Sequence, residues 1–334
     1  MTLFCSHYDD APHRETLDGI DVIRAGNRST FNYTVPRWYR RHVDALAPDI
    51  VIDDINKIPF FTPLYVRRPL LALIHHFFGP AIFQQAGFAA GAYVKFFEDR
   101  IGRIYRNTPI NVVSESTRKE CIERGLDGSH ISVIHNAIDQ HAFPMTVGTK
   151  NARPTIVYFG RLKKYKSVDH LLLAAAMVKR DIPDLRVNIM GTGDDRPRLE
   201  DLCRELGIAD NVTFTGFVTD EEKVRMLSEA HVAVNTSVKE GWGITNIEAN
   251  ACGTPVISAD VPGLRDSIRD GESGKLYQYG DIDSLARTIK HVLVNDEECR
   301  RLSEGAVRWA STFTWERSAR EMIELCTRTI ASYR

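Results

Sequence analysis

Two glutamates, Glu240 and Glu248, stand eight positions apart in the stretch KEGWGITNIEANACGTPVIS. The glycine turn at residues 241–243 leads into a helix that we expect from Ile244 onward, because glycine permits backbone conformations that other residues disfavour. The first amides of a helix lack internal partners and carry the positive end of its dipole. The start of this helix is therefore a predicted seat for an anion.

Two cations at a neighbouring strand end could hold the same anion. Arg161 and Lys166 follow the predicted strand TIVYFG, and arginine offers a planar fork of donors while lysine offers a compact charge. With the helix start they describe a diphosphate site built without a metal ion. The acidic pairs that could bind magnesium, at residues 53–54, 194–195 and 281–283, lie elsewhere, so we expect neither a metal nor a cofactor. Asp281 or Asp283 is the expected cap of the helix that follows them.

Glu248 lies about one turn into the expected helix, with apolar neighbours at helical spacing. A carboxylate in such surroundings costs several kcal/mol unless donors satisfy it. The two hydroxyls of a ribose would donate to it from about 6 Å beyond the anion seat, given a rise of about 1.5 Å per residue. Glu240 precedes the turn and is the candidate for contact with a group attached to the far phosphate.

Each of these features also has a simple structural explanation. Arg161 and Lys166 could form a solvated basic loop, and Glu248 could be a buried glutamate satisfied by backbone groups. His75 and His76, which end the predicted strand LLALIHH, could be core or edge histidines. The combination favours a functional site, because open α/β sheets bind ligands beyond the carboxyl ends of their strands, where all these loops lie.

The glycines Gly191 and Gly193 follow another predicted strand, RVNIMG, and could form an ordinary turn. Arg196 stands where the dinucleotide-binding pattern needs its last glycine, which argues against an oxidoreductase. These glycines remain candidates for a nucleotide pocket of another kind.

The elements that position these loops follow a regular alternation. From residue 154 onward, the β-branched runs TIVYFG, RVNIMG, NVTFTG, HVAVNTS and TPVISAD alternate with amphipathic helices, which predicts parallel strands in a doubly wound sheet. The first part repeats the pattern in TLFCSH, IDVIRAG, DIVIDD, LLALIHH, INVVSES and ISVIHN, so a second sheet of the same class is expected. Residues 140–153 are polar and aperiodic, which indicates a linker.

Composition narrows the class of protein. A length of 334 residues exceeds the roughly 100–200 residues of one ordinary domain and favours two. A net charge of −1 offers no general attraction for nucleic acid. Six scattered cysteines without a C-x-x-C pair indicate reduced thiols in a cytoplasmic protein. The uncharged run at residues 69–94 is interrupted by His, Gly-Pro and Gln pairs, so we expect no spanning helix, with a shallow interfacial contact as the minority alternative.

The stretch from Glu240 to Ser258 closely resembles the retaining nucleotide-sugar glycosyltransferases of glycosyltransferase family 4, which have the two-domain GT-B fold. The segments FGRLKKYKSVDHLL, FTGFVTDEEKVRML, DGESGKLYQYGDIDSLA and FTWERSAREM share the resemblance, which covers essentially all of residues 154–334. VSESTRKECIERG and ISVIHNAID resemble the last strands before the linker of that fold.

The resemblance implies an α/β fold of two Rossmann-like, doubly wound domains that face each other across a cleft. The expected order is an N-terminal acceptor-side domain at residues 1–143, a linker at 144–153, a nucleotide-sugar donor domain at 154–312 and a C-terminal helix at 313–334 that packs back toward the first domain. Family members usually begin with a strand, a glycine-rich loop and a helix ahead of the strand that TLFCSH resembles. We therefore expect the first domain to lack this unit, through a late start or a truncation. Two inner strand edges would lose their partner, and an oligomer could pair them.

The resemblance also implies roles for single residues. Arg161 and Lys166 would hold the donor diphosphate, Glu248 would bind the ribose and Glu240 would lie against the donor sugar. His75 matches a histidine that faces that sugar, and His76 is the close alternative. The other donor-binding positions are Gly160, Gly191, Gly193, Gly216 and Phe217 around the nucleotide and the backbone of Gly241, Trp242, Gly243, Ile244 and Thr245 along the sugar.

The implied activity is transfer of a hexose from GDP-mannose or a UDP-hexose to a glycan or lipid-linked acceptor, in the synthesis of a cell-surface polysaccharide or glycolipid. Arg161, Lys166 and the helix start would stabilise the departing diphosphate while the acceptor attacks on the same face, so Glu240 is not expected to act as a glycosidase-type nucleophile. A non-catalytic nucleotide-sugar-binding module is the alternative. The spacing of the two glutamates disfavours a phosphorylase or epimerase of the same fold. The glycosyltransferase that the resemblance implies would be cytoplasmic, with peripheral contact at the inner membrane face as an option.

Overall fold

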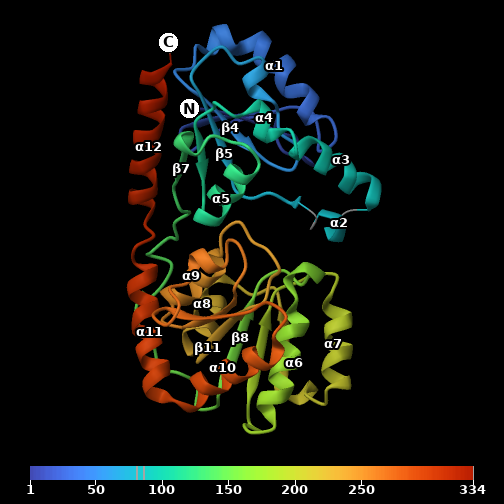
Figure 1. Ribbon diagram of the computed structural model, residues 1–334, viewed down its shortest axis with the longest axis vertical. Coiled ribbons are helices and arrows are strands. Elements are labelled where there is room, and N and C mark those ends of the chain that lie inside the picture. The colour runs from blue at the N-terminus through green and yellow to red at the C-terminus, as the bar shows by residue number, and fades with distance from the viewer. Residues whose placement is uncertain (80–81, 86, 334) are drawn as a thin grey trace.

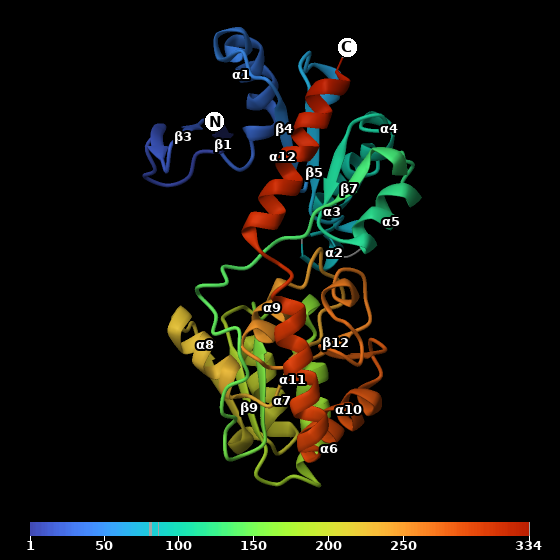
Figure 2. The same cartoon turned by 90° about the vertical axis from the view of Figure 1, so that its left-hand side faces the viewer.

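Two α/β units stand one above the other in the computed structural model, which describes the chain except residues 80–81, 86 and 334 (Figure 1). The N-terminal unit runs from β1 to β7, and the C-terminal unit runs from β8 to α11. Helix α12 (Trp315–Ser332) leaves the C-terminal unit and returns along the N-terminal one (Figure 2).

The C-terminal unit is built on six parallel strands in the order β10-β9-β8-β11-β12-β13. Their bounds are β8 Thr155–Phe159, β9 Arg186–Met190, β10 Val212–Gly216, β11 Val232–Asn235, β12 Val256–Ala259 and β13 Gly274–Tyr277. Helices cover both faces, so the central strands are almost entirely buried and read as continuous apolar runs. The predicted doubly wound sheet is confirmed, and β13 is an edge strand that the sequence pattern did not reveal.

The helices of this unit are α6 Val168–Lys179, α7 Arg196–Glu205, α8 Asp220–Glu229, α9 Ile244–Ala251, α10 Ile282–Val294 and α11 Asp296–Ala310. Capping residues fix where several of them begin. The Thr219 and Glu222 side chains form a capping box at the start of α8. Asp281 accepts a hydrogen bond from Ser284 N–H over 2.8 Å and caps α10, the role predicted for Asp281 or Asp283.

The N-terminal unit contains two sheets, so the expectation of one second sheet was wrong. A parallel sheet runs in the order β4-β5-β6-β7, and a separate sheet has the order β1-β3-β2, in which β2 is antiparallel to β3. Asp18 and Gly19, at φ angles of 50° and 79°, form the tight turn between β2 and β3. In the described sheets β1 and β4 are both edge strands, as the expectation of two unpaired inner edges requires. The strands are β1 Thr2–Cys5, β2 Arg14–Leu17, β3 Ile20–Arg24, β4 Val51–Ile55, β5 Leu70–Ile74, β6 Ile110–Val112 and β7 Ile131–Val133.

Helices α1 Phe31–Leu46, α2 Ile82–Gln85, α3 Phe88–Glu98, α4 Ile101–Ile104 and α5 Glu115–Glu123 complete the N-terminal unit. The uncharged run at residues 69–94 contributes β5, α2 and part of α3, although residues 80–81 and 86 of it lie outside the described part. Among the helices that the structure describes, none is both long and apolar enough to cross a bilayer.

The chain passes between the units twice. After β7 it enters the C-terminal unit, where Ile138 and Phe143 join a hydrophobic cluster with Val157 of β8. After α11 it turns back into α12, whose Leu325 packs against Leu71 of β5. The two passages are joined to each other, because Ile138 N–H donates to the carbonyl of Phe313 over 3.4 Å.

Candidate functional site

The loops that follow β8, β9 and β10 are packed together at the carboxyl end of the sheet. Gly191 N–H donates to the Gly216 carbonyl over 2.8 Å. A Cβ atom on Gly191 would lie 2.0 Å from Gly160 O, and one on Gly193 would lie 1.9 Å from Leu162 O. The backbones approach so closely that only glycine fits at these positions. The structure thus brings together the four predicted pocket glycines, and the neighbouring Phe217 side chain is 86% exposed.

Lys166 and Glu240 form an ion pair between the loop after β8 and the loop after β11. Both side chains are mostly buried. The short helical turn Lys164–Lys166 carries Lys166, and Thr236 Oγ1 donates to the Lys166 carbonyl over 2.9 Å. Arg161, on the same loop, is exposed and donates to the Tyr165 hydroxyl over 2.8 Å. The two predicted cations therefore lie on one short loop, with Lys166 in direct contact with the predicted sugar-binding carboxylate.

Helix α9 is fixed at its first turn by Asn246, a buried residue that the sequence reasoning missed. The Asn246 side chain accepts a hydrogen bond from Asn235 Nδ2 of β11 and donates one to Ser267 Oγ, each over 2.9 Å. The backbone amides of Ile244 and Asn246 donate within the turn to the carbonyls of Trp242 and Gly243. The turn thus uses two of the amides predicted for an anion, so the dipole of α9 and the nearby cations must supply much of the attraction.

Trp242 turns its ring away from this loop. The ring is buried, stacks on His135 at 4.6 Å between centroids and meets the Phe313 ring at 5.3 Å. Its predicted role concerned the backbone of residues 241–245. The side chain packs instead where the two passages between the units cross.

Glu248 meets Lys223 of α8, a partner absent from the sequence prediction. Lys223 Nζ lies 3.3 Å from Glu248 Oε1, and both side chains are largely buried. Burial raises the pKa of Glu248, and the charge of Lys223 opposes that shift. Burial also disfavours the charged form of Lys223, but Glu248 and Asp220 outweigh it and raise the pKa of the lysine. A largely buried carboxylate with one cationic partner keeps lone pairs free for hydroxyl donors.

The end of β5, from the N-terminal unit, lies against the loop that contains Glu240 and Gly241. A Cβ atom on Gly241 would lie 2.4 Å from the His75 carbonyl oxygen. The His75 ring pairs with Asp54 at 3.2 Å, and this hydrogen bond raises the pKa of His75. Burial lowers the pKa of His76, although the charge of Glu240 partly opposes that shift. The structure turns His75 toward β4, which favours His76, the alternative, as the histidine beside Glu240.

In the part of the chain that the structure describes, no three His, Cys, Asp or Glu side chains gather as metal ligands would. The site is instead a junction of cations, glycine-rich backbone and a helix start, the kind of arrangement that binds phosphates.

Known families match this chain over nearly its whole length. The sequence model "Glycosyl transferases group 1" matches residues 140–309, and the model "Glycosyltransferase Family 4" matches residues 1–141.

The relatives of this chain include proteins named D-inositol 3-phosphate glycosyltransferase, among them those from two organisms. The one from Geodermatophilus obscurus is 38% identical over 198 residues, which are 57% of this chain and 43% of that protein. The one from Mycolicibacterium smegmatis is 34% identical over 223 residues, or 62% of this chain and 50% of that protein. The chain thus spans about half the length of the curated relatives that it matches.

Solved structures show the same fold. Sucrose-phosphate synthase from Thermosynechococcus elongatus has a TM-score of 0.77 at 21% identity and covers 99% of this chain and 89% of its own. Anabaena HepE in complex with UDP has a TM-score of 0.74 at 18% identity, with 92% and 86% covered.

Proposed function

Because the chain belongs to the group 1 glycosyltransferases of family 4 and has their GT-B fold, we propose that it transfers a hexose from a nucleotide diphosphate sugar to an acceptor hydroxyl with retention of configuration. The observation that carries the proposal is the contact between Lys166 and Glu240 beside the first turn of α9. Lys166 is the proposed partner of the donor's phosphate, and Glu240 is the proposed partner of its sugar. Their contact would therefore lie where the phosphate and the sugar of one donor join.

The donor half of the proposal assigns one part of the molecule to each loop. Arg161, Lys166 and the dipole of α9 attract the diphosphate, and Glu248 accepts hydrogen bonds from the ribose. Lys166 exchanges its bond with Glu240 for a bond with phosphate, which leaves the Glu240 carboxylate free for a sugar hydroxyl. The UDP bound in the HepE structure supports a uridine nucleotide as the first donor to test, with GDP-mannose as the alternative.

The reaction breaks the bond between the sugar C1 and the diphosphate oxygen, and the diphosphate leaves with the bonding pair. The acceptor hydroxyl attacks C1 on the face that the diphosphate leaves, and its proton passes to the departing phosphate oxygen. Arg161 and Lys166 stabilise the negative charge that grows on the diphosphate as the bond breaks. Neither step requires a protein nucleophile.

The acceptor half belongs to the N-terminal unit. The relatives' name, D-inositol 3-phosphate glycosyltransferase, supports an acceptor with several hydroxyl groups, and we keep a glycan or a lipid-linked sugar as the acceptor class. Such an acceptor places the reaction in polysaccharide or glycolipid synthesis, with peripheral contact at the cytoplasmic face of a membrane.

Binding and turnover of UDP-glucose, UDP-N-acetylglucosamine and GDP-mannose test the proposal, and NMR of the product reports its anomeric configuration. We expect one donor to bind in the micromolar range typical of enzyme substrates and to be consumed when an acceptor is added. Glu240→Gln should abolish turnover, while Glu304→Gln, an exposed glutamate on α11, should leave it intact. Donor binding without turnover toward any acceptor would instead support a non-catalytic binding module.

A further inference from the structure

Helix α5 is a second part of the N-terminal unit, besides the end of β5, that meets the loop carrying Glu240. In its first turn Ser116 N–H donates to Asp266 Oδ2 of the C-terminal unit over 3.3 Å. One turn further on, Glu120 Oε2 accepts a hydrogen bond from Lys239 Nζ over 2.8 Å. Lys239 directly precedes Glu240, so this contact joins α5 to the chain next to the predicted sugar-binding carboxylate.

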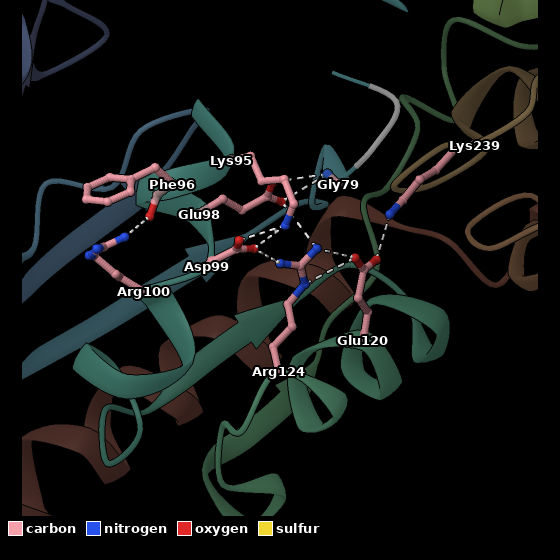
Figure 3. A network of polar contacts seen from close by, with 9 residues as sticks. All are labelled: Gly79, Lys95, Phe96, Glu98, Asp99, Arg100, Glu120, Arg124 and Lys239. Carbon is pink, nitrogen blue, oxygen red and sulfur yellow. Dashed lines mark hydrogen bonds and ion pairs between the residues drawn. The ribbon is translucent and has the colours of Figure 1, made fainter. Parts of the chain in front are cut away.

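The carboxylate of Glu120 is held at both of its oxygens (Figure 3). Its Oε1 accepts from Arg124 Nη2 at 2.8 Å and from Arg124 Nε at 3.2 Å. The Arg124 guanidinium lies 3.6 Å from Glu98, a buried carboxylate that accepts from Gly79 N–H over 3.0 Å. The polar network therefore links the loop after β5 to the loop that contains Lys239.

These two loops also touch through their backbones. The space beside Gly241 ends at the His75 carbonyl, so the loop cannot move further toward β5. On the other side, the Glu240 carboxylate bonds Lys166 of the C-terminal unit. Two ion pairs therefore hold this part of the chain. One joins the Glu240 carboxylate to Lys166, and the other joins its neighbour Lys239 to Glu120.

We propose that Glu120 is a positioning residue for Glu240: by binding Lys239 from the N-terminal unit, it holds the Glu240 loop against the end of β5 and so assembles the reacting site from both units. The inference rests on the proposed function, which gives Glu240 its contact with the transferred sugar. Both partners are partly buried, which strengthens a charge-assisted hydrogen bond relative to a fully exposed pair. The hydrogen bonds that the structure describes for Glu240 itself, to Pro262 and Lys166, both come from the C-terminal unit.

Glu120→Gln and Lys239→Met test the proposal in steady-state kinetics. Each should lower kcat on the order of ten- to a hundredfold, because a small misplacement of a positioned group costs that much. The affinity for UDP should stay within about twofold, since the diphosphate contacts lie in the C-terminal unit. The double variant should be no worse than either single one, because the two residues act through one contact. Lys239→Arg should restore most of the activity.

The matched control is the pair Lys290 and Asp181, which is also a lysine–carboxylate contact, 2.7 Å long, but lies at the surface of the C-terminal unit. Lys290→Met and Asp181→Asn should leave kcat unchanged. Additive losses in the double variant, or an unchanged kcat in both single variants, would overturn the proposal.

Hydrogen exchange gives a readout that needs no turnover. In Glu120→Gln the amides of residues 75–79 and 239–243 should exchange faster, while those of α10 should not change. Unchanged exchange in both loops would refute the positioning role. If the wild-type protein transfers no sugar, the proposed function fails, and the exchange experiment still decides whether Glu120 holds the loop.

Discussion

At the scale of single residues, the pair formed by Lys166 and Glu240 means that the free protein already satisfies the cation that a diphosphate would need. In the proposed donor complex the phosphate displaces the carboxylate, so part of its attraction to Lys166 is spent on breaking this contact. A partly buried ion pair of this kind is worth on the order of 1 kcal/mol.

Glu240→Gln should therefore bind free UDP more tightly than the wild type, by about three- to tenfold, because it leaves Lys166 without its carboxylate partner. Isothermal titration calorimetry measures this, with Glu304→Gln as the control that removes an equal charge from an exposed site. An affinity for UDP that falls in Glu240→Gln would contradict the exchange of partners.

The two histidines at the end of β5 should separate in kinetics. Partial desolvation lowers the pKa of His76, which favours the neutral ring, and a neutral ring can both donate and accept a hydrogen bond. His76→Ala should lower kcat by about tenfold or more, while His75→Ala, whose ring pairs with Asp54, should change it by less than about threefold. The reverse order would assign the sugar-facing role to His75.

The sequence indicated which residues of the candidate site could bind a ligand, but it did not indicate the residues that support them. Arg161, Lys166 and the two glutamates were visible because each stands in a local pattern after a strand. Lys223 and Asn246 carry no such signal. Lys223 bonds Glu248 only because α8 packs beside α9. The Asn246 side chain bonds Asn235 only because the end of β11 lies against the first turn of α9. Contacts between residues far apart in sequence come from tertiary packing, which a single sequence does not display.

At the scale of elements, several hydrogen bonds hold the segment between the units against the C-terminal unit, and the partly buried Lys150 makes three of them. Lys150 Nζ donates to the carbonyls of Ser228 and Gly253 over 3.0 and 2.9 Å and to Thr254 Oγ1 over 2.8 Å. These oxygens lie near the carboxyl ends of α8 and α9, where a cation is favourable. Burial nevertheless lowers the pKa of Lys150 to about 8 from its ordinary 10.5.

The lowered pKa of Lys150 predicts that the unfolding free energy rises as the pH increases. Below pH 8 both folded and unfolded chains carry the proton, so the cost of burying the charge is fully present. Between pH 8 and 10.5 the folded chain releases the proton first, and the cost disappears. The unfolding free energy of the wild type relative to Lys150→Met should thus rise by about 2–3 kcal/mol from pH 7 to pH 10.

Urea denaturation at a series of pH values measures this difference, and the comparison with the variant cancels the titration of all other groups. Lys290→Met, at an exposed lysine on α10, should show no such rise relative to the wild type. A flat difference for Lys150→Met would show that the lysine keeps its ordinary pKa.

Most strands and helices were predictable because apolar periodicity reports burial, and the misses have particular causes. The hairpin of β2 and β3 carries a sequence signal, the turn pair Asp18 and Gly19 between two short runs, but it does not belong to the alternation of strands and helices that indicates parallel sheets. The edge strand β13 begins at Gly274, where a Cβ atom would lie 2.0 Å from the Val256 carbonyl. Glycine permits this close packing of two strands, but it lowers the β-propensity by which a strand is recognised in a sequence.

At the scale of the whole molecule, α12 makes the last segment of the chain part of the first unit. Leu325 is buried against Leu71 of β5 and Ile134, while Ile323, two positions earlier on the same helix, is 65% exposed. The helix covers sheet residues that would otherwise face water, so its apolar face contributes to the stability of a unit from which it is distant in sequence.

Leu325→Ala should lower the unfolding free energy by about 2–4 kcal/mol, because it removes buried apolar contact and leaves a cavity. Ile323→Ala, a loss of similar size at an exposed site on the same helix, should change it by less than about 0.5 kcal/mol. Thermal or chemical denaturation followed by circular dichroism compares the two. Equal effects would mean that α12 is not held on β5 in solution.

The bond between Ile138 and Phe313 has a kinematic consequence. Two units joined by a single segment of chain can rotate relative to each other in every direction. Two adjacent connecting segments limit the rotation mainly to one hinge axis, the line that runs through both segments. Figures 1 and 2 place both passages along one edge of the molecule, and α2 of the N-terminal unit meets the turn Lys164–Lys166 toward the opposite edge. The largest displacement of such a rotation falls far from the hinge line, at the turn that carries Lys166, the proposed phosphate ligand.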